Sequence, residues 1–298
     1  MAEQSNPTSK PKTRSDRPVA ILGGNRIPFA RQDKAYAKVG NQDMFTAALD
    51  GLVGRFNLQG ERLGMVAGGA VLKHSRDFNL IRESVLGSAL SPYTPAFDIQ
   101  QACGTGLQAI TTVADGIARG RYDAAIGGGV ESISLSTGKL MEEDARDPQF
   151  KAAWERTDKR ASREIPAPWH DPREDAELPD VYLTMGETAE NVAQQYQITR
   201  AEQDAFAVKS HHKAAAARAA GKLTDEIVPI TTKAGTIGED GIIRSDSSVE
   251  VLGGLKPAFS QDGTVTAGTS SPLTDGASAV LVTSEEFATR HGLKILAR

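Results

Sequence analysis

One residue in this sequence is suited to covalent chemistry, because the chain contains a single cysteine, Cys103. It lies in residues 101–107, between an extended run and a predicted helix that begins at Gly104. The free N–H groups and partial positive charge at a helix N-terminus stabilise a thiolate, the nucleophilic form of cysteine. Gly104 and Gly106 also let a substrate or a neighbouring backbone come close. The segment therefore suits an acyl-accepting thiol, although a lone cysteine is more often a structural residue packed behind its helix.

The segments that position Cys103 alternate between short apolar runs and helical patterns. The apolar runs predict strands at 19–22, 65–72, 95–99, 122–130 and 276–282. Helical spacing predicts helices at 41–56, 78–86, 104–119 and 284–291. Asn41 is expected to cap the first of them, and Leu107, Ile110, Ala114 and Ile117 to share one face of the third. This order indicates an α/β fold with a parallel sheet and covering helices.

The composition bounds the class of protein. The chain is 39% hydrophobic and 24% charged with a formal net charge of −4, which suits a sizeable core and gives no support to a nucleic-acid or membrane-surface role. It has no apolar run long enough to span a bilayer, and a single cysteine fits a reducing compartment, so we expect a cytoplasmic location. The adjacent pair His211 and His212 diverges on a predicted helix, so no metal site is expected.

The chain divides by composition. Residues 1–17 are polar and predict a disordered tail, whereas 18–133 and 264–291 carry the strand and helix signals of one domain. Residues 137–180 are charged and lack periodicity, and helical patterns follow at 186–196 and 199–220. Thr199 with Glu202 predicts a capping box at the start of the second of these helices. We therefore expect an inserted domain at 134–263, and the start of a further domain at 292–298, in which residues 293–298 would open a strand.

Five segments, in order along the chain, resemble motifs of the thiolases. They are Arg-Ile-Pro-Phe at 26–29, Gln-Ala-Cys-Gly-Thr-Gly-Leu at 101–107, Gly-Gly-Gly-Val-Glu-Ser at 127–132, Met-Gly-Glu-Thr-Ala-Glu-Asn at 185–191, and Val-Thr-Ala-Gly-Thr-Ser-Ser-Pro-Leu-Thr-Asp-Gly-Ala at 265–277. The resemblance covers residues 18–298. It implies the N-terminal half of the thiolase αβαβα architecture, with the inserted domain as the loop domain that covers coenzyme A.

The resemblance also implies an activity, that of an acyl-CoA C-acyltransferase in fatty-acid β-oxidation or acetoacetyl-CoA synthesis. Cys103 would carry the acyl group, and its own N–H would help to stabilise the oxyanion. Ser271 and Ala267 would contact the pantetheine arm, and Met185 would line the acyl pocket. The substrates would be acyl-CoA, 3-ketoacyl-CoA and CoA, with no permanently bound cofactor and no metal. The complete protein would be a homodimer or homotetramer.

Plainer interpretations of these residues stay open. Ser271 precedes Pro272 and suits a turn, and Met185 suits ordinary packing. Thr184 stands where many thiolases have histidine, and Thr269 where they have asparagine, which leaves the substrate preference undecided. Thr184 argues against the short-chain biosynthetic subtype.

Three motifs on which the family's mechanism depends do not occur in the 298 residues: Gly-His-Pro, Cys-x-Gly and Asn-Glu-x-Phe. We therefore expect a chain truncated before its C-terminal domain and inactive, or nearly so, by itself, because a thiol without its base is mostly protonated at neutral pH. A ketosynthase of the same superfamily is disfavoured, because a serine-rich continuation does not follow Cys103. The alternative function is a non-catalytic remnant that at most binds CoA or a homologous chain.

Overall fold

A computed structural model describes residues 16–135, 147–161, 170–233, 235–260 and 262–298. The expected disordered tail at 1–17 lies almost wholly outside the described residues, as does part of the charged stretch at 137–180.

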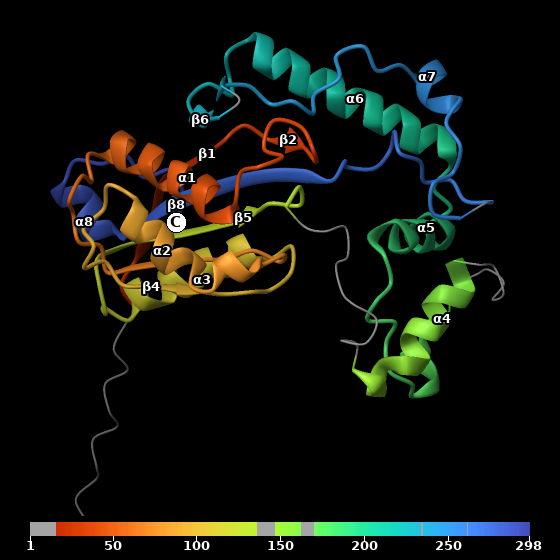
Figure 1. Cartoon of the computed structure of the whole chain (residues 1–298), viewed down its shortest axis with the longest axis horizontal. Helices are drawn as coiled ribbons and strands as arrows, with labels where there is room; N and C mark the ends of the chain where they lie inside the picture. Colours follow the sequence, from red (N-terminus) through yellow and green to blue (C-terminus); the bar gives the residue numbers. More distant parts are fainter. Residues whose placement is uncertain (1–15, 136–146, 162–169, 234, 261) are drawn as a thin grey trace, which may run out of the picture.

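The five predicted strands lie in one six-stranded sheet, whose sixth strand, the two-residue Ala30–Arg31, was not predicted (Figure 1). Its strands are β1 (Val19–Arg26), β2 (Ala30–Arg31), β3 (Met65–Gly68), β4 (Ala96–Asp98), β5 (Ala124–Glu131) and β8 (Thr274–Ser284). The order is β1-β8-β5-β3-β4, and β2 also pairs with β8. β3 pairs in parallel with β4 and β5, but β8 runs antiparallel to β1 and β5. The expectation of a parallel sheet is wrong for β8. The chain leaves the sheet at the C-terminal end of β5 and returns at the same edge to begin β8, so that β8 runs antiparallel to β5.

Helices cover both faces of this sheet and make three layers. They are α1 (Asn41–Phe56), α2 (Leu80–Gly87) and α3 (Thr105–Ala118), followed at the end of the chain by α8 (Glu285–Arg290). The core on the side of α1 and α2 takes from the strands Val66, Ile126 and Leu281. The core under α3 takes the adjacent strand residues Ala67, Ala125 and Val282. This alternation is that of strand side chains, which point in turn to opposite faces of a sheet.

The predicted apolar face of α3 is confirmed at Ile110, Ala114 and Ile117, which pack against the sheet, but not at Leu107. Ala109, Val113 and Ile117 are fully buried, whereas Leu107 is 69% exposed. α3 approaches β5 so closely that a side chain on Gly127 would lie 2.7 Å from the Cα atom of Ile110. The glycines of β5 thus set which side of α3 faces the sheet, and helical periodicity alone does not contain that information.

Two further element predictions need correction. Gly40, not Asn41, is the N-cap of α1, and the buried Asn41 amide donates instead to the Leu72 carbonyl (2.9 Å) and to Asp77 (2.8 Å). β3 ends at Gly68, because residues 69–72 turn away to contact β5 and the segment before Cys103. Residues 293–298, expected to open a strand, make a single bridge between Ala297 and Ile21.

The remaining elements lie beside the sheet in the inserted segment (Figure 1). They are α4 (Lys151–Ala161), α5 (Met185–Gln195), α6 (Arg200–Ala219), β6 (Ile230–Thr232), β7 (Gly235–Ile237) and α7 (Val249–Gly253). Short 3-10 helices occupy Ser75–Asp77, Pro148–Phe150 and Pro172–Asp175. The predicted capping box of α6 is present, since Thr199 and Glu202 exchange side-chain and backbone hydrogen bonds. The domain limits at 134 and 263 stay a prediction.

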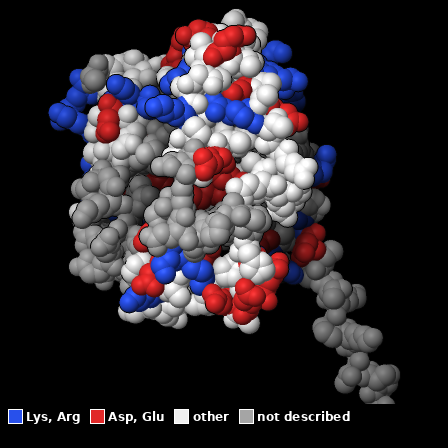
Figure 2. Space-filling view, turned by 90° about the vertical axis from the view of Figure 1, so that its right-hand side faces the viewer, with Lys and Arg blue, Asp and Glu red and all other residues white. Residues whose placement is uncertain are grey.

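Figure 2 shows the face of the molecule that lies on the right-hand side of Figure 1. Its described residues include basic side chains as well as acidic ones. Such mixing is typical of a solvated surface. Within the described ranges, no helix combines the length and the apolarity that crossing a bilayer demands.

Candidate active site

Cys103 lies in a tight turn between β4 and α3, and its side chain is exposed. The Gln101 N–H donates to the Thr105 hydroxyl (2.8 Å), which donates in turn to the carbonyl of Ala102 (2.7 Å). The Thr105 N–H also donates to that carbonyl (3.1 Å). The first residue of α3 therefore fixes the turn that presents the thiol. The exposure of Cys103 argues against the interpretation of a cysteine packed behind its helix.

The backbone immediately before Cys103 is strained. Ala102 has a φ of +43°, in the left-handed region that residues other than glycine rarely adopt. Such a conformation costs on the order of 1 kcal/mol and persists only where its surroundings fix it. The turn is thus a feature that the fold maintains against a local preference.

Gly69, near the Cys103 turn, is required because another part of the backbone passes close to it. A side chain on Gly69 would lie 2.0 Å from the carbonyl oxygen of Ile99 and 3.3 Å from the methyl group of Thr105. Only a residue without a Cβ atom fits there, because the first obstacle is backbone. The loop after β3 therefore contacts the segment that carries Cys103.

Gly69→Ala is expected to lower the free energy of unfolding by about 2 kcal/mol, because backbone must move to admit the methyl group. Gly54→Ala is the matched control, since a side chain on this exposed helical glycine meets nothing within 4 Å. The control is expected to stabilise the chain by up to about 1 kcal/mol through its higher helix propensity. Urea denaturation of both variants measures the difference, and equal effects would contradict the close approach.

Four of the five segments that resemble thiolase motifs lie at one edge of the sheet, and the fifth, 185–191, lies in α5. Gly68 at the end of β3 pairs with Asp98 at the end of β4, and Glu131 at the end of β5 pairs with Gly276 near the start of β8. The turn with Cys103 leaves this edge after β4, and the segment with Ser271 enters it before β8. Functional groups of α/β folds commonly gather at such an edge.

The Arg-Ile-Pro-Phe segment joins the sheet to the inserted segment. The Arg26 guanidinium donates to both carboxylate oxygens of Asp240 (2.6 and 2.9 Å) and lies 4.6 Å over the ring of Phe29. The Phe29 N–H also donates to Asp240 (2.8 Å). Burial acts to raise the pKa of Asp240, but the bonds from Arg26 and Phe29 outweigh it and the pKa is lowered. The ring of Phe29 fills the space where a side chain on Gly276 would lie, at 2.5 Å.

The structure brings the element of Met185 against the segment of Ala267 and Ser271. A side chain on Gly186 would lie 2.1 Å from the Phe259 ring, so that ring covers the start of α5. The Glu190 carboxylate accepts from the N–H groups of Thr264 and Val265, at 2.8–3.0 Å. Two contacts thus hold α5 against the residues that lead to β8.

The three side chains expected to bind substrate there are all exposed: Met185, Ala267 and Ser271. Met185 is 73% exposed, which does not suit ordinary packing. Ala267 and Ser271 flank a turn in which the Ser270 hydroxyl donates to the Thr266 carbonyl (2.8 Å). Within the described ranges, no hydrogen bond links Cys103 to any of the three, so their shared role stays a proposal.

The two departures from the thiolase pattern have local structural roles. Thr184 is the N-cap of α5: its hydroxyl accepts from the Glu187 N–H (3.3 Å) and donates to the Glu187 carboxylate (2.8 Å). Thr269 accepts from the Thr266 N–H (3.0 Å) and closes the turn before Ser271. The spacing Thr-x-x-Glu at 184–187 is a capping-box signal that sequence reasoning overlooked.

In the part of the chain that the structure describes, none of the five histidines makes a hydrogen bond or a ring contact with Cys103, and each contacts another group instead. The ring contacts are those of His74 with the Ser132 carbonyl (3.3 Å), His170 with Asp175 (3.0 Å), His211 with the Arg244 N–H (3.2 Å), His212 with the Ser247 carbonyl (2.9 Å) and His291 stacked on Phe287 (4.2 Å between centroids). The described residues thus place no histidine in contact with the candidate nucleophile.

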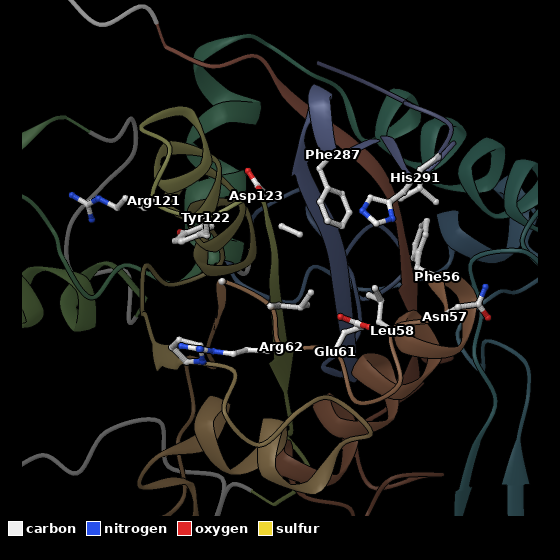
Figure 3. Close-up of a pocket in the computed structure, with 15 residues that line it drawn as sticks. Phe56, Asn57, Leu58, Glu61, Arg62, Arg121, Tyr122, Asp123, Phe287 and His291 are labelled. Atoms are coloured by element: carbon white, nitrogen blue, oxygen red, sulfur yellow. The ribbon is translucent and has the colours of Figure 1, made fainter. Parts of the chain in front are cut away.

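A cavity of about 820 Å³ lies at the opposite edge of the sheet, where β3, β4 and β5 begin (Figure 3). Tyr122 and Arg62 line one side of it, and Phe287 and His291 the other. It contains none of the residues that resemble thiolase motifs, so we place the candidate active site at the edge of Cys103 and not in this cavity.

Comparison with known proteins agrees with this arrangement. The family model described as the thiolase N-terminal domain matches residues 19–286. The 3-ketoacyl-CoA thiolase of Yersinia enterocolitica is 36% identical over 293 residues, which cover 95% of this chain and 66% of that protein. The 3-ketoacyl-CoA thiolase of Vibrio cholerae is 35% identical over 292 residues, covering 96% and 67%.

The crystal structure of the Bacillus anthracis acetyl-CoA acetyltransferase superposes with a TM-score of 0.75 at 29% identity, covering 95% of this chain and 69% of that one. This confirms the predicted thiolase-like fold. The chain spans about two thirds of the length of the curated relatives that it matches. On the match over residues 19–286, the chain belongs to the thiolase family, of which it carries the N-terminal domain.

Proposed function

We propose that this chain supplies the acyl-accepting cysteine of a thiolase-type acyl-CoA C-acyltransferase. The observation that carries the proposal is the presentation of Cys103: an exposed thiol on a strained turn at the start of α3. A helix N-terminus offers free N–H groups and a partial positive charge, which favour a thiolate and an oxyanion. The family membership supports the same reaction class.

In the proposed reaction the Cys103 thiolate attacks the thioester carbonyl of an acyl-CoA. A sulfur–carbon bond forms, the bond to the CoA sulfur breaks, and CoA leaves as a thiolate that takes up a proton. The N–H of Cys103 stabilises the negative oxygen of the intermediate. The bond between the acyl carbon and the Cys103 sulfur then breaks and the Cys103 thiolate is released. The acyl carbon bonds instead to the sulfur of a CoA thiolate, or to the α-carbon of a second acyl-CoA, which gives up its α-proton to a base.

The remaining roles are proposed on the same basis. Ser271 and Ala267 contact the pantetheine arm, and Met185 borders the acyl group. CoA enters as a substrate, without a permanently bound cofactor or metal. We further propose that residues 134–263 form the domain covering CoA, that the complete protein is a cytoplasmic homodimer or homotetramer, and that it acts in fatty-acid β-oxidation or acetoacetyl-CoA synthesis.

A non-catalytic role is the second candidate, and the engagement of all five histidines away from Cys103 favours it. In that role the chain at most binds CoA or a homologous chain.

Bromoacetyl-CoA and bromoacetamide both alkylate Cys103 with loss of bromide, but only the first carries CoA. Comparing their rates therefore distinguishes a thiol beside a CoA-binding site from an isolated thiol. The CoA derivative is expected to react at least about tenfold faster, since binding of its pantetheine arm holds the reactive carbon beside the sulfur. Free CoA is expected to remove the advantage. Equal rates that CoA does not change would mean that Cys103 and the segment of Ser271 do not form one site.

A further inference from the structure

Residues 69–72 lie between the end of β5 and the turn that carries Cys103. On one side the Gly69 carbonyl accepts from the N–H of Val130 (3.1 Å). On the other side, the Ile99 N–H donates to the Gly68 carbonyl (2.8 Å), and Gly69 lies directly against the Ile99 carbonyl. We call residues 69–72 the support loop.

Glu131, the last residue of β5, holds the support loop through both of its carboxylate oxygens. One accepts from the N–H of Val71 and the other from the N–H of Leu72, each at 2.9 Å. Hydrogen bonds to a charged acceptor are about twice as strong as neutral ones. Glu131 thus holds two consecutive N–H groups, one with each carboxylate oxygen.

The support loop in turn contacts the residues on both sides of Cys103. The Gln100 side-chain amide donates to the Val71 carbonyl (3.0 Å), three residues before the cysteine. A side chain on Gly69 would lie 3.3 Å from the methyl group of Thr105, whose hydroxyl closes the Cys103 turn. The loop therefore touches the start of the turn and the residue that ends it.

Because Ala102 is strained, the position of the neighbouring Cys103 thiol depends on the contacts that the support loop makes. A left-handed alanine reverts to a commoner conformation unless its neighbours are fixed, and that reversion would move the Cys103 sulfur relative to the N–H groups of α3. Displacements of about 1 Å at a reacting atom cost on the order of 100-fold in rate.

We infer that Glu131 is a positioning residue for Cys103: through the support loop and Gln100, it holds the strained turn in the geometry that presents the thiol. The inference rests on the proposed function of Cys103. Glu131 itself does not touch the substrate.

Glu131→Gln tests the inference, because glutamine keeps the shape but places an NH2 group, a donor, where one of the two acceptor oxygens faces an N–H. Hydrogen exchange is expected to become about tenfold faster at the amides of Val71 and Leu72, and also at those of Gln101 and Thr105, as for the loss of one charge-assisted hydrogen bond. Alkylation of Cys103 by bromoacetyl-CoA is expected to slow by about tenfold, with a smaller change for bromoacetamide.

Gln100→Leu removes the hydrogen bond from the Gln100 side chain to the Val71 carbonyl, which joins the Cys103 turn to the support loop. This variant tests the inference if Glu131→Gln does not fold. The double variant is expected to show no more than the larger single effect, because both changes act through one loop. Glu61→Gln, before β3 at the opposite edge of the sheet, is the matched control and is expected to change neither readout.

Two results would overturn the inference: unchanged exchange at Gln101 and Thr105 while Val71 and Leu72 exchange faster, or additive effects in the double variant. The exchange readout does not depend on CoA. If the unaltered chain shows no preference for bromoacetyl-CoA, the proposed function fails while the positioning role of Glu131 is still measured.

Discussion

Acetyl transfer from acetoacetyl-CoA to Cys103 is expected to be about 100-fold to 10,000-fold slower in this 298-residue chain than in the 3-ketoacyl-CoA thiolase of Vibrio cholerae, the range that a positioned general base contributes. The physical reason is the absence of a base beside the thiol in the described residues, where every histidine has another partner. A thiol that keeps its proton is a poor nucleophile.

The measurement is the intact mass of the chain over time after mixing with acetoacetyl-CoA, with Cys103→Ala as the control for acetylation elsewhere. Acetylation at a rate similar to that of the Vibrio enzyme, and lost in the control, would show that the chain supplies its own base. The absence of an adduct from a folded chain would agree with the prediction, and addition of the alkylating CoA derivative would then show whether CoA still binds.

Asp240→Asn is expected to lower the free energy of unfolding by about 3 kcal/mol, because it leaves Arg26 without its buried partner. The two side chains are only 13% and 5% exposed, and the bond joins residues 214 positions apart. Urea denaturation measures the loss. Lys151→Ala is the control: it breaks an exposed pair with Glu155, and it is expected to cost less than about 0.5 kcal/mol.

The contribution of Asp240 is also expected to depend on pH. Its folded pKa lies below its ordinary value of 3.8, because the bonds from Arg26 and the Phe29 N–H outweigh burial. The stabilisation is therefore fully present above that ordinary value and is lost as the pH falls through the lower, folded value. The gap in stability between the unaltered chain and Asp240→Asn is expected to narrow as the pH falls below 3.8. A gap that stays constant over this range would mean that the charge of Asp240 does not stabilise the fold.

The sequence by itself determined those features that depend on local pattern. Cys103, with its flanking glycines, marked the one candidate nucleophile and its place at the start of a helix, and Thr199 with Glu202 marked the start of α6. The strand segments and the α/β class followed from apolar periodicity. The ordered matches to thiolase motifs implied the family, which the comparisons then confirmed.

Only the tertiary structure decided features that depend on distant contacts. Three predictions were wrong: the direction of β8, the burial of Leu107 and the assignment of Asn41 as an N-cap. Local sequence pattern carries neither the direction of a strand nor the identity of the packing partner. The bond from Arg26 to Asp240 and the two bonds from Glu131 to the support loop join residues far apart in the chain.

The left-handed conformation of Ala102 also depends on contacts with residues distant in the sequence. Nothing in an alanine between Gln101 and Cys103 indicates a positive φ, because its own preference is against it. That conformation exists because the ends of β3, β4 and β5 bring the support loop, Gln100 and Thr105 to one place and fix the backbone between them. The sequence thus identified the residue that carries the chemistry, and the packing of the sheet edge decided how that residue is presented.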